Sequence, residues 1–230
     1  KAYYLIQGTL QQVAQPVLVD VGDERERQLH ILRKMMRLAA FLSFPLLFGL
    51  GMVSHEFIVF TITEKWATSA SFMRLLCISG AFVPLSFLLS NLIISKGRSS
   101  VYLGINTGLG AAQITAILCL YPYGIRPMII ALVVINILCF WVWGLFARHY
   151  AGYRLMMIAR DTLPFAFIAL FVMGVTWYTT RFIDSLPLLL LARVSMASLL
   201  YFVIMKVAVV VVLKEIIAFF REKTRRKQKT

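Results

Sequence analysis

Charged residues are scarce in this sequence. Only 15% of its 230 residues are charged, whereas 60% are hydrophobic and the mean hydropathy is +0.80. This composition excludes an ordinary soluble domain and indicates an integral membrane protein. The net charge of +14 does not indicate nucleic-acid binding, because the basic residues flank apolar runs instead of covering one face of a polar domain.

Patterns that carry catalysis are also missing. His30, His55 and His149 lie on different segments without metal-ligand spacing. The sequence has no glycine-rich phosphate loop and no nucleophile elbow, and its acids lie at the ends of apolar runs or between them. Adjacent His55 and Glu56 could pass a proton in principle, but neighbours in sequence do not share a helix face. We therefore expect no enzyme activity, no metal and no cofactor.

Cysteine is rare as well. Cys77, Cys119 and Cys139 are isolated within apolar runs, and such a set excludes a disulfide framework and indicates packing residues. The chain begins at Lys1, within a helical pattern, without an initiator methionine or a signal peptide. We therefore expect it to be the C-terminal part of a longer protein.

One stretch, from Arg33 to Trp66, organises the chain. A basic group (Arg33, Lys34 and Arg37) precedes an uncharged run, 38–53, which contains a proline. An apolar run of this length predicts a membrane-spanning helix, and lipid-embedded helices tolerate proline. The basic group predicts the cytoplasmic end of this helix.

The remaining apolar runs predict the same kind of element. We expect an all-α integral membrane protein with about seven transmembrane helices in one bundle. The predicted spans are 2–19, 35–55, 72–94, 101–120, 128–146, 163–180 and 188–213, followed by a basic tail at 214–230.

The basic residues predict the orientation of the bundle. Connections on one side of the predicted spans carry 17 lysines and arginines, against 4 on the other side. This bias places the tail and the Lys96–Arg98 turn in the cytoplasm and the Tyr121–Pro127 turn outside. The segment from Arg148 to Asp161 mixes arginines with apolar residues, which predicts an amphipathic helix lying in the interface.

Amides form the candidate substrate cavity. Gln7, Gln11 and Gln15 recur every four residues and therefore share one helix face. Asn106 and Gln113 share a face of a later span. In lipid, such amides either line a cavity for a polar substrate or form hydrogen bonds that hold helices together. The sequence leaves both interpretations open.

The basic residues near the membrane surfaces also allow two interpretations. Arg33, Lys34 and Arg37 are either ordinary positive-inside anchors or contacts for an anionic headgroup. Lys206 lies within an apolar run, where it either snorkels to the cytoplasmic surface or faces the cavity as a deeper headgroup contact. Arg193 is expected to be an interface anchor.

A spaced pattern gives the chain a family resemblance. The residues that carry it are Pro16, Asp23–Glu26, Phe44–Leu50, Glu56, Lys65–Ala67, Leu75–Leu76, Gly80 and Lys96–Arg98. In these positions the chain resembles the C-terminal half of MATE-like polysaccharide exporters, the Wzx-type translocases of O-antigen and other lipid-linked oligosaccharides. The resemblance covers roughly the first hundred residues, and the remainder matches in span number and charge.

The resemblance implies a fold and a function. The seven spans would be helices eight to fourteen of a fourteen-helix transporter, packed against an N-terminal lobe of the same protein. The cargo would be a glycan linked to undecaprenyl diphosphate, moved across the bacterial inner membrane by alternating access. An H+ or Na+ gradient could drive transport, and polysaccharide polymerase or export proteins would be partners. The alternatives are a MATE-like multidrug or small-solute exporter and a polytopic membrane enzyme, an acyltransferase or polymerase of glycan assembly.

Overall fold

The computed structural model describes residues 25–183 and 185–208, and these residues form helices without any strand. The helices are α2 (Arg25–Met52), α3 (Ser54–Thr61), α4 (Ala67–Gly80), α5 (Val83–Ser95), α6 (Ser99–Leu120), α7 (Ile125–Ala151), α8 (Leu155–Thr180) and α9 (Leu186–Ala208). Short 3-10 turns at Glu64–Trp66 and Tyr121–Tyr123 join neighbouring helices. The predicted first span, 2–19, and the predicted tail, 214–230, lie outside the described residues.

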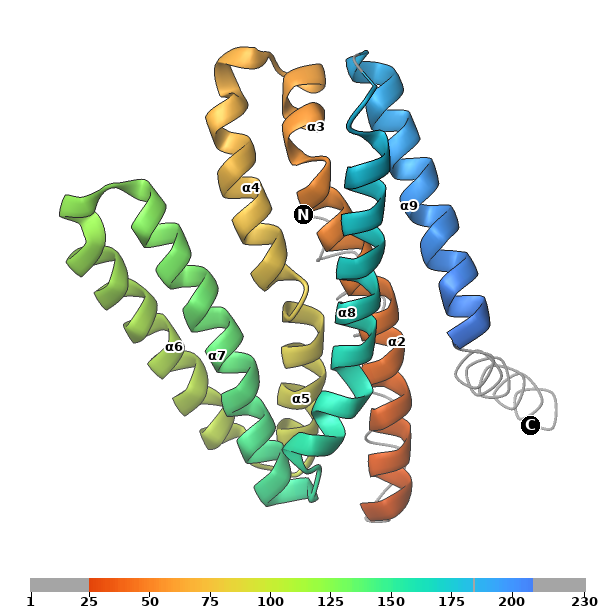
Figure 1. Cartoon of the computed structure of the whole chain (residues 1–230). Coiled ribbons are helices and arrows are strands. Elements are labelled where there is room, and N and C mark those ends of the chain that lie inside the picture. Colours follow the sequence, from red (N-terminus) through yellow and green to blue (C-terminus); the bar gives the residue numbers. More distant parts are fainter. Residues whose placement is uncertain (1–24, 184, 209–230) are drawn as a thin grey trace, which may run out of the picture.

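Six segments of the described chain are long and apolar enough to cross a membrane. They run alternately up and down the bundle, with α6 and α7 at one side and α9 at the other (Figure 1). The prediction of an all-α, polytopic membrane protein is confirmed. We call one end of the bundle the basic end: α2 and α8 begin there, and α7 and α9 finish there. We call the other end the opposite end.

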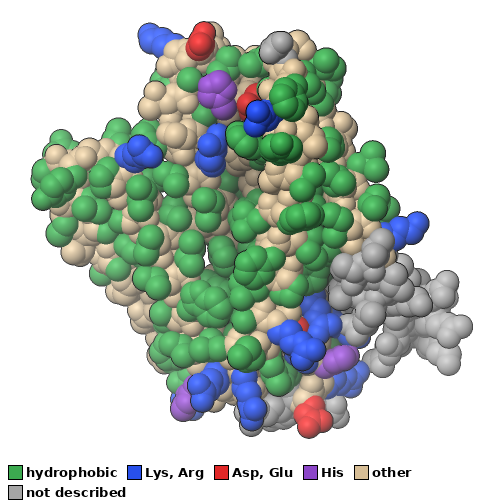
Figure 2. Space-filling model, in the orientation of Figure 1, with side chains coloured by type: hydrophobic (Ala, Val, Ile, Leu, Met, Phe, Trp, Pro, Cys, Tyr) green, Lys and Arg blue, Asp and Glu red, His purple; other side chains and the backbone are tan. Residues whose placement is uncertain are grey.

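Most of the visible surface is hydrophobic, as a lipid-facing surface requires. Lysine and arginine gather mainly at the basic end, with a smaller group toward the opposite end (Figure 2). The core lies between α2, α5, α7 and α8, where Met36, Phe44, Leu89, Phe140 and Ile158 are fully buried or nearly so. These residues fix how the long helices rotate against one another.

The predicted span at 72–94 is broken in two. It consists of α4 and α5, separated at Ala81–Phe82, with Pro84 in the first turn of α5. A proline has no N–H and its ring clashes with the carbonyl four residues before it, so the helix ends just before this position. Ser43 of α2 donates a 2.9 Å hydrogen bond to the carbonyl oxygen of Ala81 at the break.

The prediction of an interfacial helix between Arg148 and Asp161 is wrong. Helix α7 continues through Ala151, a turn covers 152–154, and α8 begins at Leu155. Gly152 ends α7 in the left-handed conformation with φ of 74°, which a glycine adopts without strain. The segment is therefore a tight connection between two spanning helices.

Helices α7 and α8 approach closely above this turn. A Cβ atom added to Gly144 would lie 2.8 Å from a methyl carbon of Leu155, so any side chain at this position would have to displace that of Leu155. The Gly104 and Gly108 pair on α6 behaves differently, because nothing described lies within 4 Å of a Cβ at either position. This face of α6 is exposed, and no described helix packs against the two glycines.

Candidate functional site

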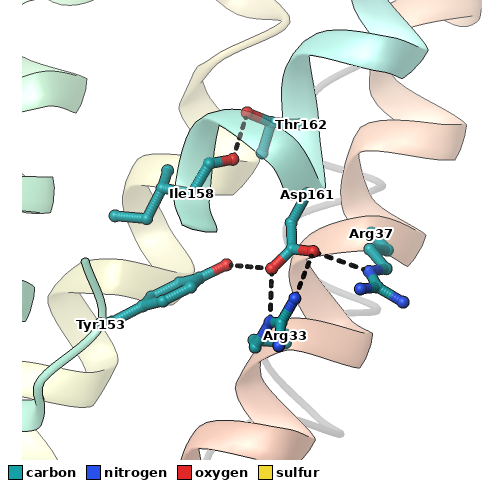
Figure 3. A network of polar contacts seen from close by, with 6 residues as sticks. All are labelled: Arg33, Arg37, Tyr153, Ile158, Asp161 and Thr162. Atoms are coloured by element: carbon teal, nitrogen blue, oxygen red, sulfur yellow. Dashed lines mark hydrogen bonds and ion pairs between the residues drawn. The ribbon is translucent and has the colours of Figure 1, made fainter. Parts of the chain in front are cut away.

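The most polar group in the described bundle surrounds Asp161, near the basic end. Asp161 lies in the second turn of α8 and is only 1% exposed. Arg33 and Arg37 on α2 and Tyr153 in the turn before α8 point toward its carboxylate (Figure 3). We call these four residues the Asp161 cluster.

The carboxylate of Asp161 accepts four hydrogen bonds. Arg33 binds it with both arms of the guanidinium, Nε to Oδ2 at 2.7 Å and Nη2 to Oδ1 at 3.1 Å. The Nε of Arg37 donates to Oδ1 at 2.8 Å, and the hydroxyl of Tyr153 donates to Oδ2 at 3.0 Å. Charge-assisted bonds of this kind are the strong ones, and the bidentate fork fixes direction as well as distance.

The sequence places these donors by simple rules. Arg33 and Arg37 are four residues apart, so they lie one turn apart on the same face of α2. Tyr153 follows the left-handed Gly152, and its N–H donates to the carbonyl oxygen of Ala147, which holds the turn against α7. The turn thereby directs the Tyr153 ring into the bundle, where it is fully buried.

Tyr153 serves as a permanent hydrogen-bond donor. Burial raises the pKa of its hydroxyl well above the usual value, and the neighbouring negative charge of Asp161 raises the pKa further. The two arginines act in the other direction but do not cancel these effects. The phenol therefore keeps its proton at physiological pH.

The cluster contains two guanidinium groups and one carboxylate, and they differ in exposure. The side chain of Asp161 is wholly enclosed, whereas those of Arg33 and Arg37 are 30% and 25% exposed. The arrangement is a set of preorganised donors for oxyanions, with the arginines reaching from the buried acid to the surface.

A second buried ion pair lies toward the opposite end. Arg193 on α9 donates from Nη1 to Oε1 of Glu56 on α3 at 2.5 Å, and from Nε to the hydroxyl of Thr180 on α8 at 3.2 Å. Arg193 is 5% exposed, so its expected role as an interface anchor is wrong. Its stem points into the bundle because Glu56 offers a buried counter-charge there. We call this the Glu56–Arg193 pair.

An apolar groove of about 530 Å³ runs between α2 and α9. Pro45, Gly49 and Leu50 of α2 line one wall, Ala197 and Tyr201 of α9 line the other, and further apolar residues complete it. The groove carries little polar chemistry. It runs along α2 and α9, which still meet where Tyr201 contacts Phe41.

The structure brings only some of the predicted site residues together. Arg33 and Arg37 share the Asp161 cluster, while Lys34, the next residue on α2, is half-buried and is not among the four donors to Asp161. Gln7, Gln11 and Gln15 lie outside the described residues. Whether these side chains contact a substrate remains a prediction.

The other amides and Lys206 lie apart from the Asp161 cluster. Asn106 is exposed on α6 and donates to the carbonyl oxygen of Tyr102 in its own helix. Gln113 donates to Oδ1 of Asn136 on α7 at 3.2 Å, so it joins two helices. Lys206 is exposed near the basic end of α9, across the bundle from α6 (Figure 1).

Sequence reasoning missed Asp161 and Tyr153. Both residues were assigned to the amphipathic connector from Arg148 to Asp161, which was expected to lie in the interface. One signal could have found Asp161: two arginines one turn apart at the edge of a span need a counter-charge if their helix face is buried. Among the described residues, no group of three or more His, Cys, Asp and Glu side chains could hold a metal ion.

Comparisons with known proteins point to polysaccharide biosynthesis. A family model described as "Polysaccharide biosynthesis protein" matches residues 1–71. A Klebsiella pneumoniae protein named "Uncharacterized membrane protein in cps region" is 26% identical over 91 residues, which are 40% of this chain and 19% of that relative. "Lipopolysaccharide biosynthesis protein WzxC" of Escherichia coli K12 is 26% identical over 86 residues, 37% of this chain and 18% of the relative.

These matches confirm the resemblance to the polysaccharide-exporter family. The aligned stretches make up less than a fifth of each relative, so they concern only part of those proteins. No solved structure matches the chain.

Proposed function

We propose that the chain is a membrane lobe of a transporter that moves a lipid-linked oligosaccharide across the bacterial inner membrane. The observation that carries this proposal is the Asp161 cluster, which presents two arginines at the basic end of a largely apolar bundle. A diphosphate-linked lipid needs such a place, because its charged headgroup must be held beside a membrane that accepts its tail. The similarity to polysaccharide biosynthesis proteins supports a glycan as cargo.

In this proposal, Arg33, Lys34 and Arg37 capture the diphosphate headgroup at the cytoplasmic surface. Guanidinium groups bind phosphate oxygens in pairs, whereas an ammonium acts as a point charge. Partial desolvation at the membrane surface strengthens both attractions. Lys206, exposed near the same end, is proposed as a second contact, and the amides of the first predicted span as contacts for sugar hydroxyls.

Transport then follows alternating access, with the sugars in a polar cavity shared with a second lobe and the tail of the lipid in the bilayer. We assign the chain to transporters and not to enzymes because the resemblance is to exporters. An H+ or Na+ gradient is the proposed energy source. The basic end is assigned to the cytoplasm from the bias in its positive charges.

Export of glycan in cells that depend on this transporter tests the proposal. Arg33→Lys and Arg37→Lys retain the charge but lose the planar fork, so export should fall in both, with lipid-linked glycan accumulating on the cytoplasmic side. Arg154→Lys is the matched control, because Arg154 is an exposed arginine at the same end outside the cluster. Normal export by both variants, at normal protein levels, would show that these arginines are only anchors.

A further inference from the structure

We propose that Arg33, Arg37 and Tyr153 form a phosphate-binding site that Asp161 fills in the present state and that a diphosphate headgroup takes over. This inference rests on the proposed function, because it gives the headgroup its place. It goes further in assigning Asp161 as a resident substitute for the phosphate, and Tyr153 as a third donor.

The geometry of the donors supports the exchange of one anion for the other. A carboxylate and a phosphate both offer paired oxygens to the fork of an arginine, and the same N–H and O–H groups serve either one. Asp161 receives four hydrogen bonds between 2.7 and 3.1 Å from these donors. The site is therefore already shaped and charged for an oxyanion.

The difference in charge favours the diphosphate over the carboxylate of Asp161. A diphosphate in a lipid-linked glycan carries about two negative charges, whereas the carboxylate of Asp161 carries one, so the diphosphate attracts the guanidinium groups of Arg33 and Arg37 more strongly. Opposite charges interact more strongly where water is partly excluded, and the Asp161 carboxylate and Tyr153 are both enclosed. The exchange thus replaces a weaker counter-ion with a stronger one.

The exchange also changes how α8 is held. Once the arginines bind the headgroup, Asp161 would be a buried charge without its partners, and such a state is costly. Asp161 lies six residues from the start of α8, about 9 Å along the axis, so a movement of the first two turns of α8 would carry it away from the arginines.

Pro164 lies within α8, three residues after Asp161, and removes a hydrogen bond from the helix. The first turns of α8 can therefore pivot at Pro164, away from α2. Headgroup binding would in this way open the basic end of the bundle.

Binding of inorganic pyrophosphate to the purified full chain in lipid nanodiscs tests the exchange. Asp161→Asn removes the competing charge and keeps the size of the side chain, so we expect pyrophosphate to bind about tenfold more tightly, or about 1.4 kcal/mol. Asp161→Glu keeps a resident anion and should bind no more tightly than the wild type. Glu26→Gln is the matched control, because it removes an exposed acid at the same end and should not change affinity.

A distance measurement on the otherwise unaltered cluster provides a second test that does not depend on the folding of Asp161→Asn. Spin labels at His30→Cys on α2 and Met156→Cys on α8, both exposed, report the separation of the helices when Cys77, Cys119 and Cys139 are replaced by alanine. Pyrophosphate should lengthen this distance by several ångströms.

The outcomes separate this inference from the proposed function. Tighter binding by Asp161→Asn and a lengthened distance support the exchange. Equal affinity in the wild type and Asp161→Asn, or an unchanged distance when pyrophosphate is bound, overturns it and leaves headgroup capture intact. Absence of pyrophosphate binding in every variant overturns both.

Discussion

The hydroxyl of Tyr201 on α9 donates a 3.0 Å hydrogen bond to the backbone carbonyl oxygen of Phe41 on α2. Phe41 lies four residues before Pro45, and its carbonyl is the one that a residue with an N–H at position 45 would otherwise bind. Tyr201 therefore replaces, from another helix, the hydrogen bond that the proline removes. The two rings also pack together, with centroids 5.7 Å apart.

Tyr201→Phe should destabilise the bundle by about 1 to 3 kcal/mol, because it retains the ring but leaves the Phe41 carbonyl without its donor. Thermal unfolding in a mild detergent would measure the change. In a Pro45→Ala background the helix supplies its own N–H, so the same substitution should cost about 1 kcal/mol less. Equal costs in both backgrounds would contradict this account, and Tyr178→Phe, at an exposed tyrosine, should change little.

Gly144→Val should destabilise the protein by about 1 to 3 kcal/mol, because the new side chain would enter the contact between α7 and α8. Even a single Cβ atom there would lie 2.8 Å from Leu155. Gly104→Val is the matched control in α6, where nothing described lies within 4 Å. Thermal unfolding should separate the two variants, and equal stabilities would contradict the close approach.

The long helices could be predicted from sequence because an apolar run is a local property. Residues 101–120, for example, nearly coincide with α6, at Ser99–Leu120. Their ends were harder to predict. Helix α2 is already formed at Arg25, ten residues before the predicted span, because its charged first turns are helical outside the apolar run. Apolar length measures the membrane-embedded part of a helix, and a helix can extend beyond it.

The breaks and the site were not predicted. Pro84 was placed in the middle of one span, although a proline at that position starts a new helix, α5. The contact between Arg33 and Asp161 joins residues 128 positions apart. Which acid an arginine meets depends on the rotation and order of whole helices, and the periodicity of either helix alone does not contain that information.

The orientation of the bundle can be tested with cysteines placed at its two ends. Ser100→Cys lies near the basic end and Tyr123→Cys at the opposite end, both exposed, in a chain whose native cysteines are replaced by alanine. The positive charge at the basic end predicts that an impermeant thiol reagent applied to whole cells labels position 123 and not position 100. The reverse pattern would place the basic end outside and would remove the assigned route for headgroup entry.

The Glu56–Arg193 pair allows the sharpest stability experiment, because both partners are buried and each has a natural apolar substitute. Arg193→Met leaves the Glu56 carboxylate buried without its cation, and Glu56→Leu leaves the guanidinium without its anion. Each single change should lower the free energy of unfolding by about 3 to 5 kcal/mol, since an uncompensated buried charge is costly.

The double variant, Glu56→Leu with Arg193→Met, should recover most of this loss, because it removes both charges and fills the space with apolar atoms. Thermal unfolding of the four proteins in detergent completes the cycle, with Glu64→Gln at an exposed acid as the control, expected within about 0.5 kcal/mol of the wild type. Single variants as stable as the wild type would mean that the pair contributes little to stability. A double variant as unstable as the sum of the singles would mean that Glu56 and Arg193 act independently. Recovery would show instead that α3 and α9 are coupled through this ion pair.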